Sequence, residues 1–395
     1  MKYDCGIVGG GAAGLMAAAE LARHGKRVCI LEKQERVGRK LLSTGNGRCN
    51  LTNMDCNIAH YHGDTRYAEG ILRKYPPKIA LERFAEMGIP TRTDAEGRVY
   101  PMSNQAASVL DALRLTAAER GVDIVNTKVS AIHGHIGNFT ADDADAEFAR
   151  MLICTGGLAA PKLGADGSGY SILQKFGHRL VPRFPALTPL CTSRESVRGL
   201  KGQRLECKIS MKFNAMYAAE GEIIFGEDGI SGIAAMGMGH MAGEALARGK
   251  KPILHIHILE NASEAMEERL RNMPKRAAED FCTGIVPKRI GQTLLRLSGA
   301  ENQTLAIGDM PKSVLQNLTK LLSDWAIPIT GTGGFDQAQV TAGGVCLQDF
   351  TENLESKLEK GIFAAGEVLN IDGDCGGYNL QWAWSSALAA AEGIL

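Results

Sequence analysis

Apolar residues near the start of the chain fall into two short runs with a helical pattern between them. Residues 3–8 and 27–31 are apolar runs of strand length, and residues 12–24 have the spacing of a helix. These three segments predict one strand–helix–strand unit. Two further apolar runs, at 148–154 and 362–365, predict strands that each lead into a glycine-containing turn.

The middle of the chain has a different pattern, and three prolines between residues 182 and 189 mark its start. Proline ends helices and favours extended backbone in the residue before it, so we place a domain boundary here. Residues 205–213 and 215–225 alternate as strands do, with Asn214 or Glu220-Gly221 as the turn. Short helical patterns and then one strand pattern follow, at 264–271, 275–281, 287–297, 312–322 and 326–330.

These patterns predict an α/β fold in which the first domain is interrupted by inserts. We predict a discontinuous domain at 1–188 and 342–395, a β-rich insert at 189–252 and 325–341, and a small helical insert at 253–324. The glycine-rich and strand-like texture of the first domain resumes at its second segment, and a packed helix of small residues is predicted at its end, over 381–394.

Composition narrows the class of protein. The 395 residues are 45% apolar, and 44 lysines and arginines balance 44 aspartates and glutamates. This balance is typical of a soluble globular protein, and the absence of net charge disfavours a nucleic acid or an anionic membrane as partner. No apolar stretch is long enough to cross a bilayer, no secretory segment is recognised, and the ten cysteines form no Cys-x-x-Cys pair. We therefore expect a cytoplasmic protein with reduced thiols.

A glycine fingerprint follows the first predicted strand. Gly9, Gly11 and Gly14 have the spacing that lets a turn tighten, a pyrophosphate approach the backbone, and a helix pack closely on a strand. The start of the following helix offers free N–H groups to phosphates. Glu32 ends the second predicted strand, where its carboxylate can accept hydrogen bonds from ribose hydroxyls. A dinucleotide site is therefore predicted.

A polar, glycine-rich segment at 38–53 follows Glu32 directly. It cannot bury an apolar face, so its backbone amides and its cations Arg39, Lys40 and Arg48 are candidates for contact with phosphates or a carboxylate. A solvated loop is the alternative, which composition alone leaves equally open.

Glycine turns near the other end of the chain supply a second candidate cofactor segment. Gly366-Glu367 follows an apolar strand, and Gly376-Gly377-Tyr378-Asn379 precedes a helix whose first amides can stabilise charge on a reduced flavin. Its pairing with the fingerprint more than three hundred residues away indicates FAD held between the two ends of the chain. Trp382 and Trp384 in this helix are interpreted as core residues.

Three His-x-His pairs lack an acid or a cysteine at ordinary metal spacing, so no metal site is predicted; they are His60/His62, His133/His135 and His255/His257. Neither a Gly-x-Ser-x-Gly elbow nor a Walker loop is present, which argues against hydrolase and NTPase chemistry.

Nine segments in chain order resemble a bacterial family of FAD-binding flavoproteins of two-dinucleotide-binding-domain ancestry. The family includes proteins similar to 3-dehydro-bile-acid Δ4,6-reductase and to aminoacetone oxidase. The matching segments are 9–14, 45–53, 99–101, 155–157, 177–178, 185–190, 229–232, 340–345 and 366–381.

This resemblance implies a discontinuous Rossmann-like FAD-binding domain with an inserted β-barrel-like subdomain and a small helical one. It places Glu32 on the adenosine ribose, the backbone of Val129 on the adenine, and the loop around Arg48 near the isoalloxazine ring. Together with the motifs, the resemblance implies a set of residues that contact the cofactor. They are Gly9, Gly11, Ala13, Gly14, Glu32, Lys33, Arg39, Lys40, Gly45, Gly47, Cys49, Val129, Thr155, Gly156, Gly157, Gly366, Glu367, Asn379 and Leu380.

Three positions depart from the family pattern. Ile233 replaces a common proline, Gly226-Glu227-Asp228 replaces a threonine-containing turn, and Asn370 replaces a common aspartate. The first two lie in the insert that would shape the substrate pocket, and Asn370 lies near the flavin segment, where it would alter the local charge.

Three functions are compatible with these residues. The first is NAD(P)H-driven reduction of an activated C=C bond in an apolar enone of the 3-oxo-steroid or bile-acid type, with Tyr378 as proton donor and Arg48 or Asn50 polarising the carbonyl. The chain has no second fingerprint for a stable nicotinamide site, so that reductant would bind transiently. The second is oxidation of a small amine such as aminoacetone by O₂, and the third is a flavin-binding accessory protein without turnover. The sequence leaves the substrate, the electron acceptor and the oligomeric state open.

Overall fold

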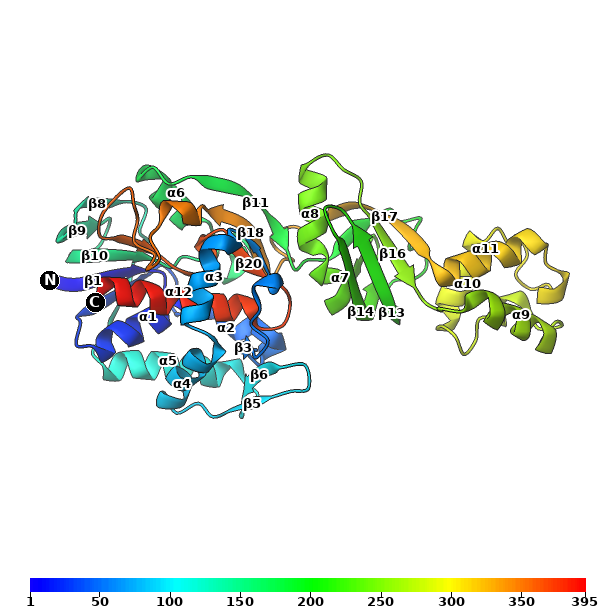
Figure 1. Cartoon of the computed structure of the whole chain (residues 1–395), viewed down its shortest axis with the longest axis horizontal. Helices are drawn as coiled ribbons and strands as arrows, with labels where there is room; N and C mark the ends of the chain where they lie inside the picture. Colours follow the sequence, from blue (N-terminus) through cyan, green and yellow to red (C-terminus); the bar gives the residue numbers. More distant parts are fainter. The chain divides into compact units, whose positions relative to one another are not determined.

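The computed structural model describes residues 1–395 and divides into two compact units (Figure 1). Unit 1 consists of Met1–Phe184 and Gln339–Leu395, and unit 2 of Pro185–Ala338. The predicted three-part division, with boundaries at 188 and 342, stays a prediction beside these two units. None of the helices combines the length and the apolar character needed to span a bilayer.

Unit 1 is built on a seven-stranded sheet. Five parallel strands lie in the order β7-β2-β1-β10-β19, and β9 and β8 extend the sheet antiparallel beyond the first half of β10. In chain order the bounds are β1 (Lys2–Val8), β2 (Val28–Glu32), β7 (Asp123–Asn126), β8 (Ile132–His135), β9 (Asn138–Ala141), β10 (Glu147–Ile153) and β19 (Ile362–Ala364). The ends of β1 and β10 are buried because both faces of a parallel sheet are covered, which explains their uninterrupted apolar runs.

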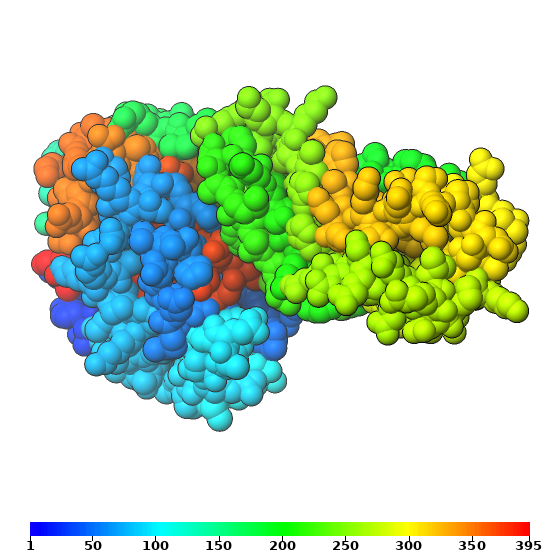
Figure 2. Space-filling model, turned by 45° about the vertical axis from the view of Figure 1, so that its right-hand side comes forward, coloured from blue at the N-terminus to red at the C-terminus, as the bar shows by residue number.

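Two helices pack against α1 (Ala12–Arg23), and they are α5 (Ala106–Glu119) and α12 (Tyr378–Ile394). Alanine and serine predominate in the buried part of α12, and these small residues allow it to approach α1 and the sheet closely. In Figure 1 the red helix α12 lies beside the blue α1, and in Figure 2 red surface of the C-terminal segment borders blue surface.

The other elements of unit 1 are short. The helices are α2 (Arg39–Ser43), α3 (Thr65–Lys74), α4 (Pro77–Glu86) and α6 (Ser168–Lys175). Small sheets pair β3 (Thr52–Asn53) and β5 (Thr91–Thr93) with β6 (Arg98–Pro101), β4 (Tyr61–Gly63) with β20 (Ile371–Gly373), and β11 (Leu180–Ala186) with β18 (Val340–Val345).

Unit 2 contains a closed six-stranded barrel in the order β12-β15-β14-β13-β16-β17. Along β13 every second residue is buried, so the alternation in the sequence marks the side chains that fill the barrel. The strands are β12 (Leu190–Thr192), β13 (Arg204–Lys212), β14 (Met216–Phe225), β15 (Gly229–Ser231), β16 (Ile253–His257) and β17 (Trp325–Thr332). The helices are α7 (Ile233–Gly237), α8 (Gly239–Ala247), α9 (Ala262–Asn272), α10 (Lys288–Leu297) and α11 (Lys312–Ser323), and α9–α11 share one hydrophobic core with the barrel.

The predicted fold class, an α/β domain with a barrel and a helical insert, is confirmed. One local prediction is wrong, and one pair of alternatives is decided. The helix predicted at 275–281 is only a 3₁₀ turn over Ala278–Asp280, because Ala277 pairs its backbone with Ala306 instead. Glu220-Gly221 lies inside β14, and the chain turns at Asn214, where Phe213 donates its N–H to the carbonyl of Ala215.

Helices α2, α3, α7 and α8 are absent from the sequence-based prediction. α3 contains Gly70 at its centre, and α7 and α8 contain glycines that break the usual helical pattern. Packing overrides propensity at one of these glycines: a Cβ at Gly239 would lie 3.1 Å from the backbone nitrogen of Thr188.

Gly14 and Gly70 give a matched test of helix packing. A Cβ at Gly14 would lie 2.0 Å from the Gly9 carbonyl oxygen, whereas one at Gly70 would meet nothing within 4 Å. We expect Gly14→Ala to destabilise the protein by about 1–3 kcal/mol through overpacking. Gly70→Ala should leave stability unchanged or raise it by up to about 1 kcal/mol. Thermal unfolding of both variants measures this, and equal melting temperatures would contradict the close α1–β1 packing.

A buried carboxylate connects α1 to α4. Glu20 accepts hydrogen bonds from Arg23 (2.7 Å) and from Arg83 on α4 (2.9 Å). Burial alone would raise the pKa of Glu20, but the hydrogen bond from Arg23 and the charge of Arg83 hold that pKa below its ordinary value.

This lowered pKa predicts a pH-dependent effect of Glu20→Gln. A carboxyl whose folded pKa is depressed stabilises the protein above its unfolded pKa, and that contribution is lost as the pH falls through the folded value. We expect the variant to be less stable than the parent by about 1–3 kcal/mol at neutral pH. The difference should shrink in acid, and unfolding curves that stay separated by the same amount down to about pH 3 would exclude this role.

Candidate functional site

The candidate site lies where the strand order of the unit 1 sheet reverses. β1 and β10 are parallel neighbours, and the chain leaves them in opposite directions across the sheet. In open α/β sheets, ligands bind beyond the carboxyl ends of the strands at this position. The loops after β1, β10 and β19 carry Gly9, Thr155 and Gly366, so three sequence-predicted segments meet at one edge.

The three fingerprint glycines differ in what the protein itself requires of them. A Cβ at Gly9 would lie 2.6 Å from the carbonyl oxygen of Cys154, and one at Gly14 would clash with Gly9, so packing explains both. A Cβ at Gly11 would meet nothing within 4 Å. α1 begins at this open space with no side-chain cap and no acid in its first turn. The arrangement fits a diphosphate, which needs the close backbone approach and free N–H groups.

Glu32 fixes the neighbouring loops through both carboxylate oxygens. Oε2 accepts the N–H of Gly10 at 2.7 Å, and Oε1 accepts the N–H of Gln34 at 2.8 Å. Thr127 donates its N–H to the Glu32 carbonyl, so the segment leading to buried Val129 lies beside this carboxylate. Each oxygen keeps a second lone pair with which it can bind a ribose hydroxyl.

An ion pair joins the predicted cofactor segments from the two ends of the chain. Lys40 Nζ lies 2.7 Å from Glu367 Oε2, and Glu367 Oε1 accepts the N–H of Thr341 at 2.9 Å. Both side chains are about three-quarters or more covered. Next to this pair, Gly366 has a φ of +80°, and a Cβ on it would lie 3.0 Å from the Cβ of Ala13. The structure thus brings four sequence-predicted residues together.

Two other predicted cations contact protein partners. Lys33 forms an ion pair with Asp166 at 2.6 Å, and Arg39 donates to Gln34 at 2.5 Å. In the loop after β10, Gly156 has a φ of +71° with open space beside it, and a Cβ at Gly157 would lie 2.4 Å from the hydroxyl oxygen of Thr341. A role for Lys33 and Arg39 in holding the cofactor stays a prediction.

The loop at 44–50 has a strained backbone that positions Arg48 and Cys49. Gly45, Gly47 and Cys49 all have positive φ, with values of 56°, 81° and 59°. The exposed guanidinium of Arg48 lies over the ring of Tyr100 at 5.1 Å. Cys49 is fully buried, and burial raises the pKa of its thiol to about 12, so it remains protonated and is no nucleophile.

Asn50 presents a buried acceptor beside the start of α12. Its Oδ1 has no hydrogen-bond partner in the protein, and a Cβ at Gly377 would lie 2.9 Å from that oxygen. A buried unsatisfied oxygen costs about 1–3 kcal/mol, so a ligand donor at this position would explain it. The pyrimidine ring of a flavin carries an N–H of the required kind, and the fit of this site to FAD rests on this oxygen and on the open space beside Gly11.

α12 begins at Tyr378, earlier than the predicted 381, so Tyr378 and Asn379 lie in its first turn. The Asn379 side chain is held by Gly373, donating to its carbonyl at 2.7 Å and accepting its N–H at 2.9 Å. Only the backbone of Asn379, together with that of Leu380, is therefore available to a cofactor. Trp382 and Trp384 are buried, as predicted.

Asp374 is the site residue that the sequence does not reveal. Its two oxygens lie 3.1 Å from His60 Nδ1 and 3.0 Å from His62 Nε2, and the His60 ring stacks on Tyr378 at 4.4 Å. Burial would raise the pKa of Asp374, but hydrogen bonds from His62 and His60 hold it below the ordinary value. Asp374 is the acidic partner of His60 and His62, and it lies more than three hundred residues away in the chain. These three residues do not form a cluster suited to a metal ion.

Comparison with known proteins places this chain in a family. The family model described as HI0933-like protein Rossmann domain matches residues 3–393. A 3-dehydro-bile acid delta(4,6)-reductase of Clostridium scindens is 35% identical over 98% of both chains. A ribosomal RNA dihydrouridine synthase of Haemophilus influenzae is 29% identical over 98% of this chain and 97% of that protein.

A solved structure of similar fold is the 3-ketosteroid delta1-dehydrogenase of Sterolibacterium denitrificans. It covers 100% of this chain and 99% of its own, with a TM-score of 0.53 and 13% identity. At this identity the likeness bears on the fold alone.

Glu32 and Glu35 provide a matched test of the cofactor site. Glu32→Gln removes the charge that orients two backbone N–H groups and faces the predicted ribose, so FAD affinity should fall roughly tenfold or more. Glu35→Gln removes an exposed charge three residues away and should retain FAD. Flavin absorbance per protein after gel filtration measures retention. Equal flavin content in the two variants would exclude the role of Glu32.

Proposed function

This chain belongs to the HI0933-like family and is an FAD-dependent oxidoreductase, and we propose that it reduces a C=C bond conjugated to a carbonyl group, with NAD(P)H as the electron source. The observation that carries the proposal is the 35% identity, over 98% of both chains, to a protein named as a bile acid reductase. FAD supplies hydride transfer at its N5 atom when bound. The remaining tasks, which are to hold the carbonyl and to deliver a proton, fall to the protein.

Asn50 and Arg48 are suited to hold the carbonyl. The Asn50 amide carries two N–H donors besides its buried oxygen, and none of the bonds within the protein uses them. Arg48 engages only the Gly45 carbonyl through Nε, at 3.1 Å, and keeps its terminal N–H groups for a ligand. Donors of this kind stabilise the negative charge that develops on the carbonyl oxygen when hydride adds to the β-carbon.

Tyr378 is suited to deliver the proton to the α-carbon. Its ring is fixed by stacking on His60 and by an edge contact with Tyr61, whose hydroxyl donates to the Tyr378 carbonyl at 3.1 Å. Asp374 in turn holds His60. A phenol held in this way is pre-oriented, which is what general acid catalysis requires.

Two substrates meet this chemical description. One is an apolar 3-oxo-steroid enone, which is suggested by the relative named as a bile acid reductase. The other is a uracil ring, whose C5=C6 bond is conjugated to a carbonyl, and it is suggested by two relatives named ribosomal RNA dihydrouridine synthases. The second of these relatives, from Escherichia coli, is 26% identical over the whole chain. The predicted absence of a nucleic-acid partner stays a prediction, and RNA is the second candidate substrate.

An anaerobic titration tests the proposed class of reaction. NADH or NADPH should bleach the flavin of the purified holoprotein, and a 3-oxo-Δ4 steroid or a uridine-containing RNA should restore its absorbance without oxygen. Bleaching by aminoacetone with peroxide formation in air, and no response to nicotinamide, would establish the amine oxidase instead. Inertness to every donor would support the accessory protein.

Tyr378→Phe isolates the proton-delivery step. Loss of a general acid lowers rates by roughly 10²–10⁴-fold, so reoxidation of the reduced flavin by substrate should slow by at least a hundredfold. Bleaching by NADPH and FAD content should not change. Tyr67→Phe, on the exposed surface of α3, is the matched control. An unchanged reoxidation rate in the Tyr378 variant would remove Tyr378 from the mechanism.

A further inference from the structure

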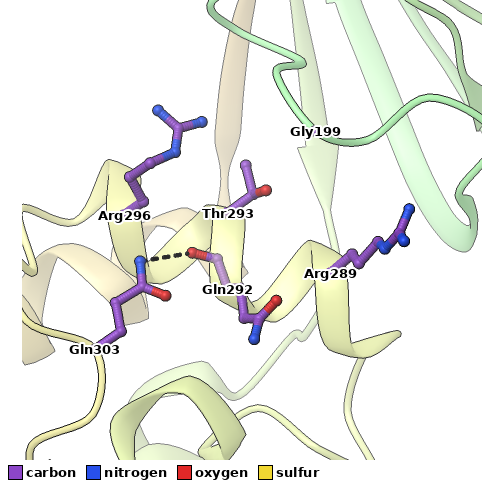
Figure 3. Close-up of a pocket in the computed structure, with 6 residues that line it drawn as sticks. All are labelled: Gly199, Arg289, Gln292, Thr293, Arg296 and Gln303. Carbon is purple, nitrogen blue, oxygen red and sulfur yellow. Dashed lines mark hydrogen bonds between the residues drawn. The ribbon is translucent and has the colours of Figure 1, made fainter.

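Unit 2 has a pocket of its own on α10. The pocket has a volume of 420 Å³ and is lined by Gly199, Arg289, Gln292, Thr293, Arg296 and Gln303. Four of these residues belong to α10, Gly199 lies in the loop between β12 and β13, and Gln303 holds the helix through a bond to the Gln292 carbonyl (Figure 3). None of these residues belongs to the cofactor site of unit 1.

The two arginines are presented as separate cations on one side of the helix. Seven residues are close to two helical turns, so Arg289 and Arg296 share a face and lie roughly 10 Å apart along the axis. In Figure 3 their guanidinium groups lie at the two ends of the pocket with Thr293 between them. This spacing is too wide for both cations to bind one phosphate, and it suits two separate phosphates of one strand.

Both guanidinium groups have bonding capacity that the protein does not use. Arg289 is exposed and makes neither a hydrogen bond nor an ion pair. Arg296 binds Glu195 through Nη1 at 3.1 Å, whereas its Nη2 is buried without a partner. An unsatisfied buried donor on a charged group is costly, and an anion at this position would satisfy it.

Positive charge is concentrated around this pocket although the whole chain is neutral. Segments 194–204 and 288–297 hold seven lysines and arginines and a single acid, Glu195. Acids contact six of these seven cations, and Arg289 is the one without an acidic partner. The pairs are Arg194 and Lys201 with Glu227, Arg204 with Glu222, Lys288 with Asp280, and Arg198 and Arg296 with Glu195. Pairs at the surface contribute little, so phosphates can compete for these cations.

We propose that the α10 pocket is a phosphate-binding site that holds the sugar–phosphate backbone of an RNA strand. The inference rests on the proposed function in its uridine form and selects the RNA over the steroid, since only the RNA brings consecutive phosphates. Arg289 and Arg296 bind two separate phosphates of the strand, and the Thr293 hydroxyl lies in the lining between them as an uncharged donor.

The test uses the full-length holoprotein with oxidised FAD and a labelled single-stranded oligouridylate. Binding should weaken with salt, because phosphate contacts release counterions. Arg289→Ala should weaken binding by roughly tenfold and lower the slope of log affinity against log salt by about 0.7, the value for one phosphate contact on a single strand. Arg271→Ala, which removes an exposed cation of α9 outside the pocket, should leave affinity and slope unchanged.

Two outcomes overturn the inference. One is an equal effect of Arg289→Ala and Arg271→Ala on RNA binding, which would mean unspecific attraction. The other is the absence of RNA binding together with binding of NADPH or inorganic phosphate that is lost in Arg289→Ala. That result would identify a site for a mononucleotide or free phosphate. FAD content and melting temperature show that the variants are folded. Because binding is measured without turnover, failure of the reductase reaction would not affect this result.

Discussion

The pairing of β10 with β1 on one side and β19 on the other is the constraint on which the cofactor site depends. These strands come from the beginning, the middle and the end of the chain, yet they are parallel and end at one edge. The turns that follow them therefore meet, although no local signal specifies that contact. The interruption of unit 1 by unit 2 does not disturb the site, because the sheet and not the chain order aligns its parts.

Two carboxylates at this edge have a double role. Glu32 and Glu367 each accept a backbone N–H from a neighbouring loop, and both are predicted to bind the cofactor. The groups that would bind FAD therefore also hold the loops around it in place. Since a ligand that binds only the folded state stabilises it, retention of FAD and stability of unit 1 are coupled. Lys40 extends this coupling to α2.

The net charge of the chain is a sum over all its residues and does not describe how charge is distributed over its surface. Equal numbers of acids and bases disfavour a polyanionic partner only if they are evenly distributed. Segments 194–204 and 288–297 hold seven bases, and of these Arg289 alone has no acidic partner. Recognition of phosphate depends on local geometry, so the position of Arg289 carries more information than the net charge.

The sequence by itself determined the elements whose signals are local. The glycine fingerprint, the apolar runs and the alternation along β13 report the contacts of residues near one another in the chain, and they predicted the fold class and FAD. α8 escaped prediction because the close packing of Gly239 against Thr188 outweighs the low helix propensity of glycine. Only the tertiary structure decided that Asp374 holds His60 and His62, that Asn50 has a buried free oxygen, and that α10 forms a pocket with a barrel loop. The free energy of such contacts depends on groups that are distant in the chain, so spacing along the sequence cannot reveal them.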